Sequence, residues 1–200
     1  MRTPRHWLYA AVSLTAAFFS LLLLVQALWI PVKAGVAQWL IERSWENALE
    51  GDVDTQPWPW ADTRPVAVLS VPSQDISQVV LEGNSGRNLA FGPVFTDGTA
   101  SGRDMVISGH RDTHFRFLSA LSPGDLIGIS NRDSTRWFEV QELDVIDSSE
   151  RELLIEPGLD RISLVTCYPF DALQAGGPLR YVVTALPVKN QPLRRLPSSG

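Results

Sequence analysis

The sequence predicts a mainly β fold: a closed barrel of about eight short strands with short helices, behind one N-terminal transmembrane helix. Residues 7–30 form an apolar run that carries no formal charge and is long enough to span a bilayer. From residue 66 onward, short runs rich in β-branched and aromatic residues alternate with turn residues. That region shows no strand–helix alternation, internal repeat or glycine-rich phosphate loop, which favours an all-β barrel.

The apolar run is the first element. As a helix, residues 7–30 would rise about 36 Å, more than the roughly 30 Å of a hydrocarbon core. Arg2 and Arg5 precede the run and Lys33 follows it with few other cations nearby, so the positive-inside rule places the N-terminus in the cytoplasm. A cleavable secretory signal is the alternative, but its apolar region is shorter and ends in small residues. We expect residues 1–33 to be a cytoplasmic flank and an uncleaved single-pass anchor.

Residues 34–64 connect the anchor to the domain. Helical spacing of the apolar residues continues over residues 34–50. The stretch from residue 51 then changes character, because Pro57, Pro59 and Pro65 cannot continue a helix. We interpret this stretch as an extended spacer; docking of its Trp-Pro-Trp element, which includes Trp58, into a groove is the alternative.

The expected domain covers residues 65–187, and its strands form an antiparallel sheet system. One short helix is expected over residues 114–121, where Phe117, Leu118 and Leu121 share a face. The tail, residues 188–200, is expected to be disordered. The clearest strand runs are residues 66–71, 76–81, 105–108, 126–130, 136–146, 162–166 and 181–186.

Composition excludes several classes of protein. Seventeen basic and 22 acidic residues give a net charge of −5, which argues against binding to nucleic acid or to an anionic lipid surface. The single cysteine excludes a disulfide framework and a zinc site built from cysteines. A hydrophobic fraction of 44% excludes wholesale disorder. We expect no cofactor.

Cys167 is the first residue with chemical potential. By the topology above it lies outside the membrane without a partner cysteine, so it is open to oxidation unless it is buried or used. It follows the expected strand 162–166, and Pro169 ends that strand, which places the thiol at a strand-to-loop junction. A small buried hydrophobic side chain is the alternative interpretation.

His110 and Arg180 complete a set. His110 follows the expected strand 105–108, and Arg180 precedes the strand 181–186. Taken singly, a loop histidine and a solvent-facing strand arginine are the simpler interpretations. Together with Cys167 they supply a nucleophile, a proton carrier and an oxyanion stabiliser for acyl transfer. Asp112 could orient a histidine in such a site.

Three motifs in this region resemble those of the sortase family. Ser108-Gly109-His110-Arg111-Asp112 resembles the histidine motif, Leu164-Val165-Thr166-Cys167 the cysteine motif, and Arg180-Tyr181-Val182-Val183 the arginine motif. The order also matches, with the cysteine 57 residues after the histidine and the arginine 13 residues after the cysteine. Ser163 replaces the usual first threonine of Thr-Leu-x-Thr-Cys but keeps a hydroxyl. The similarity covers about residues 65–186 and resembles class D and Gram-negative proteobacterial sortases most.

The resemblance implies a membrane-anchored cysteine transpeptidase that needs no cofactor. Cys167 would attack a Leu-Pro-x-Thr-Gly type sorting motif near the C-terminus of a secreted or membrane protein. His110 would protonate the leaving amine and then activate the incoming one, and Arg180 would stabilise the oxyanion. Thr166 and Asp112 would contact the substrate. An amine of the cell envelope would accept the product, with the anchor in the inner membrane and the catalytic domain in the periplasm.

Several alternatives stay open. A cysteine hydrolase of the same fold would release the substrate to water, and an anchored barrel without catalysis would only bind a partner. In a peptidoglycan L,D-transpeptidase the arginine follows the cysteine almost directly, whereas Tyr168 and Pro169 stand there in this chain. His114 lies outside the resemblance. Some sortases use calcium, and one cluster of acidic residues could suggest such a site. We interpret this cluster as a solvated acidic loop without a metal, because it lacks an EF-hand pattern. Its members are Asp147, Glu150, Glu152 and Glu156.

Overall fold

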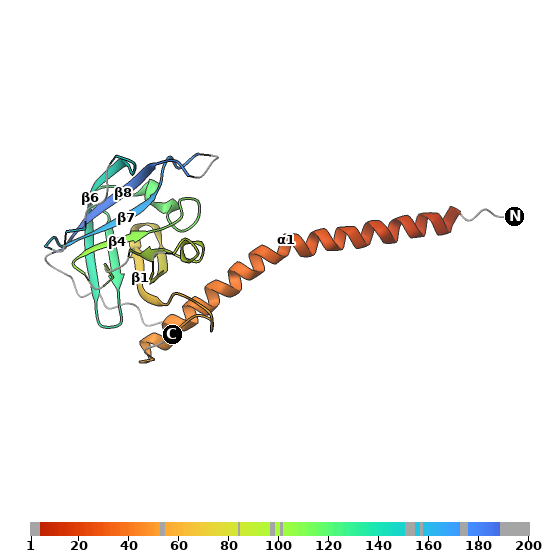
Figure 1. Cartoon of the computed structure of the whole chain (residues 1–200), viewed down its shortest axis with the longest axis horizontal. Helices are drawn as coiled ribbons and strands as arrows, with labels where there is room; N and C mark the ends of the chain where they lie inside the picture. The colour runs from red at the N-terminus through yellow and green to blue at the C-terminus, as the bar shows by residue number, and fades with distance from the viewer. Residues whose placement is uncertain are drawn as a thin grey trace. The chain divides into compact units, whose positions relative to one another are not determined.

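The computed structural model describes residues 5–52, 55–83, 85–96, 99–100, 102–150, 155–156, 158–172 and 176–188. The chain forms two compact units, Met1–Leu40 and Ile41–Gly200. A long helix, α1 (Arg5–Leu49), precedes the β domain (Figure 1). The described strands are β1 (Pro65–Val71), β2 (Ile76–Leu81), β3 (Val94–Phe95), β4 (Asp104–Ser108), β5 (Leu126–Ser130), β6 (Thr135–Asp147), β7 (Arg161–Cys167) and β8 (Leu179–Pro187).

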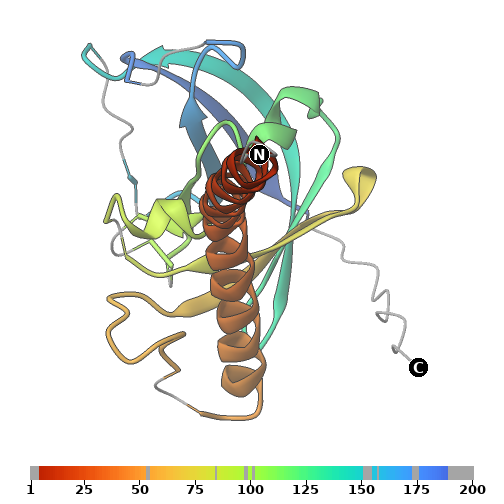
Figure 2. The same cartoon turned by 90° about the vertical axis from the view of Figure 1, so that its right-hand side faces the viewer.

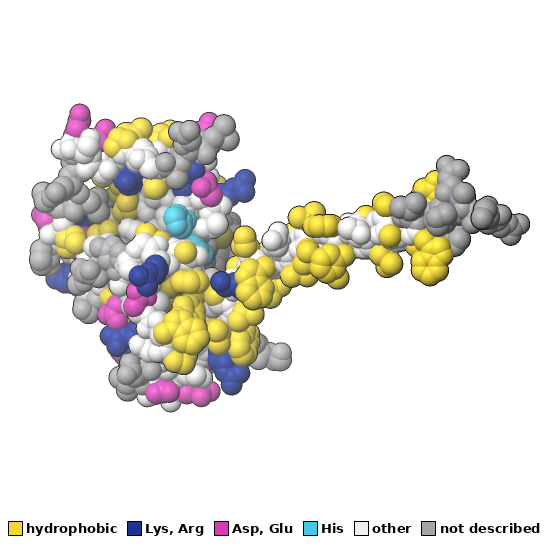
Figure 3. Space-filling view, turned by 45° about the vertical axis from the view of Figure 1, so that its right-hand side comes forward, with side chains coloured by type: hydrophobic (Ala, Val, Ile, Leu, Met, Phe, Trp, Pro, Cys, Tyr) yellow, Lys and Arg dark blue, Asp and Glu magenta, His cyan; other side chains and the backbone are white. Residues whose placement is uncertain are grey.

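Helix α1 joins the two helical stretches that the sequence suggests into one, and it continues through Pro31. The part of α1 that lies in the first unit exposes large apolar side chains, among them Leu23 (66% exposed) and Trp29 (61% exposed). Figure 3 shows hydrophobic side chains in yellow along this part of the helix. By length and composition, α1 can cross a membrane. Apolar side chains on every face fit a lipid surrounding, since a soluble helix keeps a polar face.

The C-terminal end of α1 belongs to the second unit and packs on the barrel. Ile41 is 1% exposed and forms a small apolar cluster with Leu81 of β2 and Val94 of β3. The Ser44 hydroxyl donates a hydrogen bond of 2.6 Å to the Thr55 carbonyl and ties the helix to the segment that follows it. The domain therefore begins before β1, inside α1.

The segment before β1 is docked on the domain, so our interpretation as an extended spacer is wrong for residues 55–64. The Trp58 ring lies 5.0 Å from the Phe91 ring in an edge-to-face contact. Thr55, Ala61 and Thr63 are each less than 8% exposed. Burial of these side chains offsets the entropy cost of ordering the segment, which a free spacer would not bear.

The strands close into a barrel in the order β1-β2-β3-β4-β7-β8-β6-β5, which confirms the predicted fold class. Figure 1 shows β6, β8, β7 and β4 side by side, and Figure 2 shows the same wall after a quarter turn. The strands at 76–81 and 126–130 have the expected bounds, and five others extend the expected runs by one or two residues at an end. The expected helix is a shorter 3₁₀ turn, η3 (Arg116–Ala120).

Two strand pairs correct the expected antiparallel arrangement. β2 pairs with β3 and β4 pairs with β7 in parallel, whereas the other six pairs of the barrel are antiparallel. β7 can run parallel to β4 because the long connection between them contains the β5–β6 hairpin. β3 was missing from the prediction, since a strand of two residues has no periodicity to recognise. The parallel β4–β7 pair matters most, because it carries the candidate site.

Candidate active site

The register of β4 and β7 places His110 level with Cys167. Each residue of β4 lies beside the residue 57 positions later in β7, from Asp104 beside Arg161 to Ser108 beside Val165. Pairing continues past the end of β4: the Gly109 amide donates 3.1 Å to the Val165 carbonyl, and the Thr166 hydroxyl donates 2.8 Å to the Gly109 carbonyl. The sequence separation of histidine and cysteine therefore equals the register of the two strands.

The register of β7 and β8 places Arg180 opposite Cys167. The Tyr168 amide donates 3.0 Å to the Leu179 carbonyl, so the next pair along, Cys167 and Arg180, is not hydrogen-bonded. In such a pair the Cα atoms are about 4.5 Å apart and the side chains project to the same face. The three candidates thus lie across β4, β7 and β8 at one level.

The side chains of Cys167 and Arg180 leave the barrel on its outer side. Along β7, Ile162 and Leu164 point into the core, and alternation directs Cys167 outward, where it is partly exposed. Arg180 is also partly exposed and His110 is exposed. Solvent can therefore reach all three groups.

The loop after β4 holds His110 in place. Its carbonyl accepts a 2.9 Å hydrogen bond from the Phe115 amide. A Cβ atom added to Gly109 would lie 2.7 Å from the Phe115 ring, so only glycine fits before the histidine. His114 is partly buried beside His110. Burial is the main cause that lowers the pKa of His114, and the charge of His110 lowers it further, whereas a hydrogen bond to the Ala90 backbone raises it. Figure 3 shows the histidine side chains in cyan at the surface.

Arg111 joins the two halves of the site, and sequence reasoning assigned it no role. Its side chain is 7% exposed. Nη1 donates 2.6 Å to the Pro169 carbonyl and Nη2 donates 2.9 Å to the Ala172 carbonyl, both just after Cys167. The hydrogen bond with Asp112 is the main cause that raises the pKa of Arg111, and an electrostatic interaction with Cys167 also contributes. Arg111 therefore places a permanent positive charge near the sulfur.

Asp112 and Thr166 lie differently from the expectation. Both carboxylate oxygens of Asp112 accept from Arg111, at 2.8 and 3.1 Å, so Asp112 orients that arginine in place of a histidine. This hydrogen bond lowers the pKa of Asp112 and keeps it ionised. Thr166 is 2% exposed and its hydroxyl is bound to Gly109, so this side chain ties β7 to the histidine loop and offers no surface to a substrate.

Arg180 is held by its own loop. Its Nη1 donates 2.6 Å to the Gly177 carbonyl and 2.9 Å to the Leu179 carbonyl. The Ser149 hydrogen bonds are the main cause that lowers the pKa of Asp147, and the charge of Arg180 adds to it. Of the acidic group considered for calcium, Glu152 lies outside the described residues, and within the described part of the chain no cluster suits a metal ion.

An aromatic group flanks the cysteine and was not recognised from the sequence. The Tyr168 and Tyr181 rings are stacked with centroids 6.1 Å apart, and Phe170 meets Tyr181 edge to face at 5.1 Å. Burial raises the pKa of Tyr181, so its hydroxyl stays protonated at neutral pH. These rings give the segment after Cys167 an apolar support beside the site.

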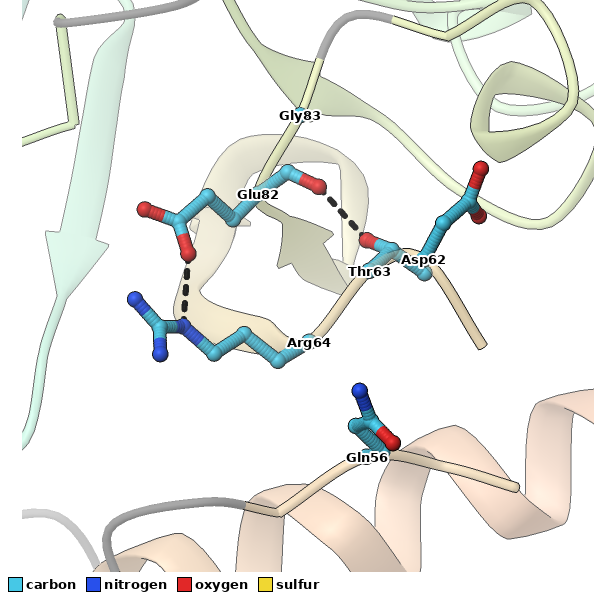
Figure 4. A pocket seen from close by; sticks show the side chains of 6 residues that line it. All are labelled: Gln56, Asp62, Thr63, Arg64, Glu82 and Gly83. Carbon is cyan, nitrogen blue, oxygen red and sulfur yellow. Dashed lines mark hydrogen bonds and ion pairs between the residues drawn. The ribbon is translucent and has the colours of Figure 1, made fainter. Parts of the chain in front are cut away.

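On the second unit, described residues line two of the pockets. One, of about 400 Å³, adjoins the site and is lined by Arg111, Asp112, Arg116, Ser119, Phe170 and Asp171. The other, of about 300 Å³, lies between the segment before β1 and the end of β2 (Figure 4). In this second pocket Arg64 and Glu82 pair with each other at 2.5 Å, and the Thr63 hydroxyl donates 2.6 Å to the Glu82 carbonyl. Because neither a histidine nor a cysteine lines this second pocket, it carries no chemistry of the acyl-transfer kind.

A barrel that presents a cysteine, a histidine and an arginine at one level defines a cysteine acyl-transfer class of protein. The model of the sortase domain matches residues 69–188. The chain belongs to the sortase family, which confirms the resemblance of its motifs. Family and fold together support a cysteine transpeptidase.

Individual relatives agree with this assignment. Sortase D of Bacillus subtilis (strain 168) is 24% identical over 123 residues, 58% of this chain and 60% of that protein. The match thus spans about three fifths of the relative's own length. The crystal structure of sortase C-1 from Actinomyces oris is 28% identical, with a TM-score of 0.52, over 62% of this chain and 72% of that one. Sortase A from Corynebacterium diphtheriae is 22% identical, with a TM-score of 0.58, over 80% and 87%.

Proposed function

We propose that this protein is a membrane-anchored sortase that cleaves a C-terminal sorting motif of Leu-Pro-x-Thr-Gly type and joins the cleaved protein to an amine. The observation that carries the proposal is the strand register, which pairs Cys167 with Arg180 and, continued two residues past the end of β4, brings His110 level with them. The 24% identity to Sortase D of Bacillus subtilis further supports a class D type of enzyme.

The first half-reaction forms a thioester. The sulfur of Cys167 bonds to the threonine carbonyl carbon of the motif, and its proton passes to His110. The bond from that carbon to the following nitrogen then breaks, and His110 returns the proton to the leaving amine. Arg180 stabilises the oxyanion; since Nη1 is held by loop carbonyls, we assign this bond to its other guanidinium nitrogens.

The second half-reaction transfers the acyl group. The neutral acceptor amine attacks the thioester carbon, and the carbon–nitrogen bond forms as the carbon–sulfur bond breaks. His110 takes the proton from the amine and the sulfur recovers it, so the enzyme returns to its starting state. Arg111, which touches the loops on both sides, is the positioning residue that keeps Cys167 and His110 together.

The cleavage test uses the full chain in detergent. A pool of Leu-Pro-x-Thr-Gly peptides, varied at x, is incubated with hydroxylamine, and intact-mass spectrometry follows the acyl adduct on Cys167. We expect hydroxamate to exceed free acid, with both lost in Cys167→Ala and strongly reduced in His110→Ala. Free acid in excess despite abundant hydroxylamine would favour the hydrolase instead.

Thiol alkylation tests catalysis against a pure binding role. If Cys167 is a nucleophile, iodoacetamide should modify it rapidly in the folded protein, and His110→Ala should slow the reaction. A thiol that stays inert until the protein unfolds would support the binding module.

The anchor and its orientation are part of the proposal. The apolar α1 and the basic residues before it support a single pass with the N-terminus in the cytoplasm and the barrel outside it. The resemblance to Gram-negative proteobacterial sortases adds the periplasm as the proposed compartment. An alkaline phosphatase fused after residue 200 should then be active in cells. If this fusion is inactive and a fusion of the phosphatase to the N-terminus is active, the orientation is the opposite of the one proposed.

A further inference from the structure

The pocket beside the site is built from two short segments. Arg111, Asp112, Arg116 and Ser119 come from the segment after His110, whereas Phe170 and Asp171 follow Cys167. Both segments start at a reacting group, and Arg111 reaches from one to the other. A volume of about 400 Å³ is enough for a small molecule or the end of a side chain. Two of its lining residues, Arg111 and Asp112, interact electrostatically with Cys167 and His110 respectively, so a group bound here would lie near the reacting groups.

The charges in this pocket are unevenly used. Arg111 and Asp112 bind each other at 2.8 Å and are therefore committed. Arg116 and Asp171 are both exposed, and across the described part of the chain neither side chain has a hydrogen bond or ion pair. The backbone carbonyl of Arg116 accepts a 2.9 Å hydrogen bond from the Ser119 hydroxyl. The pocket therefore offers one open guanidinium and one open carboxylate, with the Phe170 ring as an apolar wall.

We propose that this pocket binds the acceptor of the second half-reaction, and that it prefers an amine with a carboxylate on the neighbouring carbon. The Arg116 guanidinium matches a carboxylate through two parallel donors, and Asp171 attracts the ammonium group before it loses its proton. A plain amine fills only half of this charge pattern. The inference rests on the proposed transpeptidase function and adds to it the chemical class of the acceptor.

The test is a competition between two acceptors that differ only in the carboxylate. The full chain in detergent is given the sorting peptide that yields hydroxamate, with glycine, glycinamide and hydroxylamine at equal concentrations, and the two amide products and the hydroxamate are counted by mass spectrometry. The product ratio is then compared between variants, so the intrinsic reactivities of the amines cancel. Arg116→Gln should lower the glycine-to-glycinamide ratio about fivefold, the order expected for an exposed ion pair.

A matched control is Arg132→Gln, in the turn between β5 and β6, where the side chain is also exposed. It should leave the ratio unchanged. Asp171→Asn should reduce both amide products relative to hydroxamate, because it removes the attraction for either ammonium. A glycine-to-glycinamide ratio that is the same in Arg116→Gln and wild type overturns the proposal.

A second measurement does not depend on turnover. Saturation-transfer NMR is recorded for glycine with the full chain carrying Cys167→Ala, with and without Arg116→Gln. A glycine signal that Arg116→Gln removes supports the pocket even if the wild-type protein forms no product, in which case the proposed function alone fails. The lack of a glycine signal in both proteins rejects the pocket even if transpeptidation is found.

Discussion

The buried ion pair between Asp104 and Arg161 gives the sharpest prediction about stability. The two residues are register partners at the start of β4 and β7, six residues before His110 and Cys167 respectively. Asp104 is 0% exposed at its side chain and accepts from Arg161 at 2.9 and 3.0 Å and from the Glu156 amide at 2.7 Å. The pair therefore fixes the same register that sets the level of the site.

Asp104→Ala should cost about 3 kcal/mol of unfolding free energy. Breaking a buried pair costs about 3–5 kcal/mol, and the lower end applies because Arg161 is 22% exposed and keeps part of its hydration. The matched control is Glu82→Gln, which breaks the Arg64–Glu82 pair. Both of its side chains are 44% exposed, so the loss should stay near 0.5 kcal/mol.

Urea unfolding of the full chain in detergent, followed by tryptophan fluorescence, measures both changes. With a slope of about 2 kcal/mol per molar urea, Asp104→Ala should lower the midpoint by about 1.5 M and the control by about 0.25 M. Equal midpoints for the two variants would refute the reasoning, because burial would then have no influence on what the ion pair contributes.

Three further predictions concern the loops around the site. Gly109→Ala should lower the free energy of unfolding in urea by about 2 kcal/mol, since the added Cβ would overlap the Phe115 ring. The control Gly158→Ala has open space around the added Cβ and should lower it by less than about 0.5 kcal/mol. Similar losses in the two variants would contradict the prediction. Because the pKa of His114 lies below its usual 6.5, the folded state binds fewer protons than the unfolded state, so the free energy of unfolding should fall as the pH drops below about 6.5. Unfolding curves at pH 7.5 and 5.5 should show a smaller fall in His114→Gln than in the wild type. An equal fall in both proteins would exclude His114 as the cause. Arg111→Met should slow the alkylation of Cys167 by iodoacetamide several-fold at pH 7. Arg111→Lys keeps the positive charge and should recover part of the wild-type rate. A rate that neither substitution changes would show that Arg111 does not influence the thiol.

The sequence predicted the barrel and its long strands because runs of β-branched residues between turns report directly on a half-buried sheet. It also brought together Cys167, His110 and Arg180 in one hypothesis. The separation of His110 and Cys167 equals the register of the parallel β4–β7 pair, and Cys167 and Arg180 are partners in the antiparallel β7–β8 pair. The direction of β7 relative to β4 was not predictable, because the pairing of strands depends on how the long connection between them folds.

The missed features depend on contacts between distant segments. The carbonyls that the Arg111 side chain binds, those of Pro169 and Ala172, lie 58 and 61 residues further along the chain. These hydrogen bonds can form only after the loop that contains Arg111 meets the loop after Cys167. No local pattern around an arginine in a loop reports such partners. The docking of Trp58 against Phe91 is similar, since prolines in the sequence show where a helix ends but not whether the chain packs afterwards.

Because hydrogen-bonded neighbours align the three groups, the loops that join the strands are free to change length during evolution. An insertion in a loop between β4 and β7, such as the turn between β5 and β6, would alter the numbering distance from imidazole to thiol and leave their spatial separation intact. A single deletion inside β7, between Arg161 and Cys167, would instead turn the sulfur toward the barrel interior. Natural variation should therefore accumulate in the connections and spare the few residues at the ends of β4, β7 and β8.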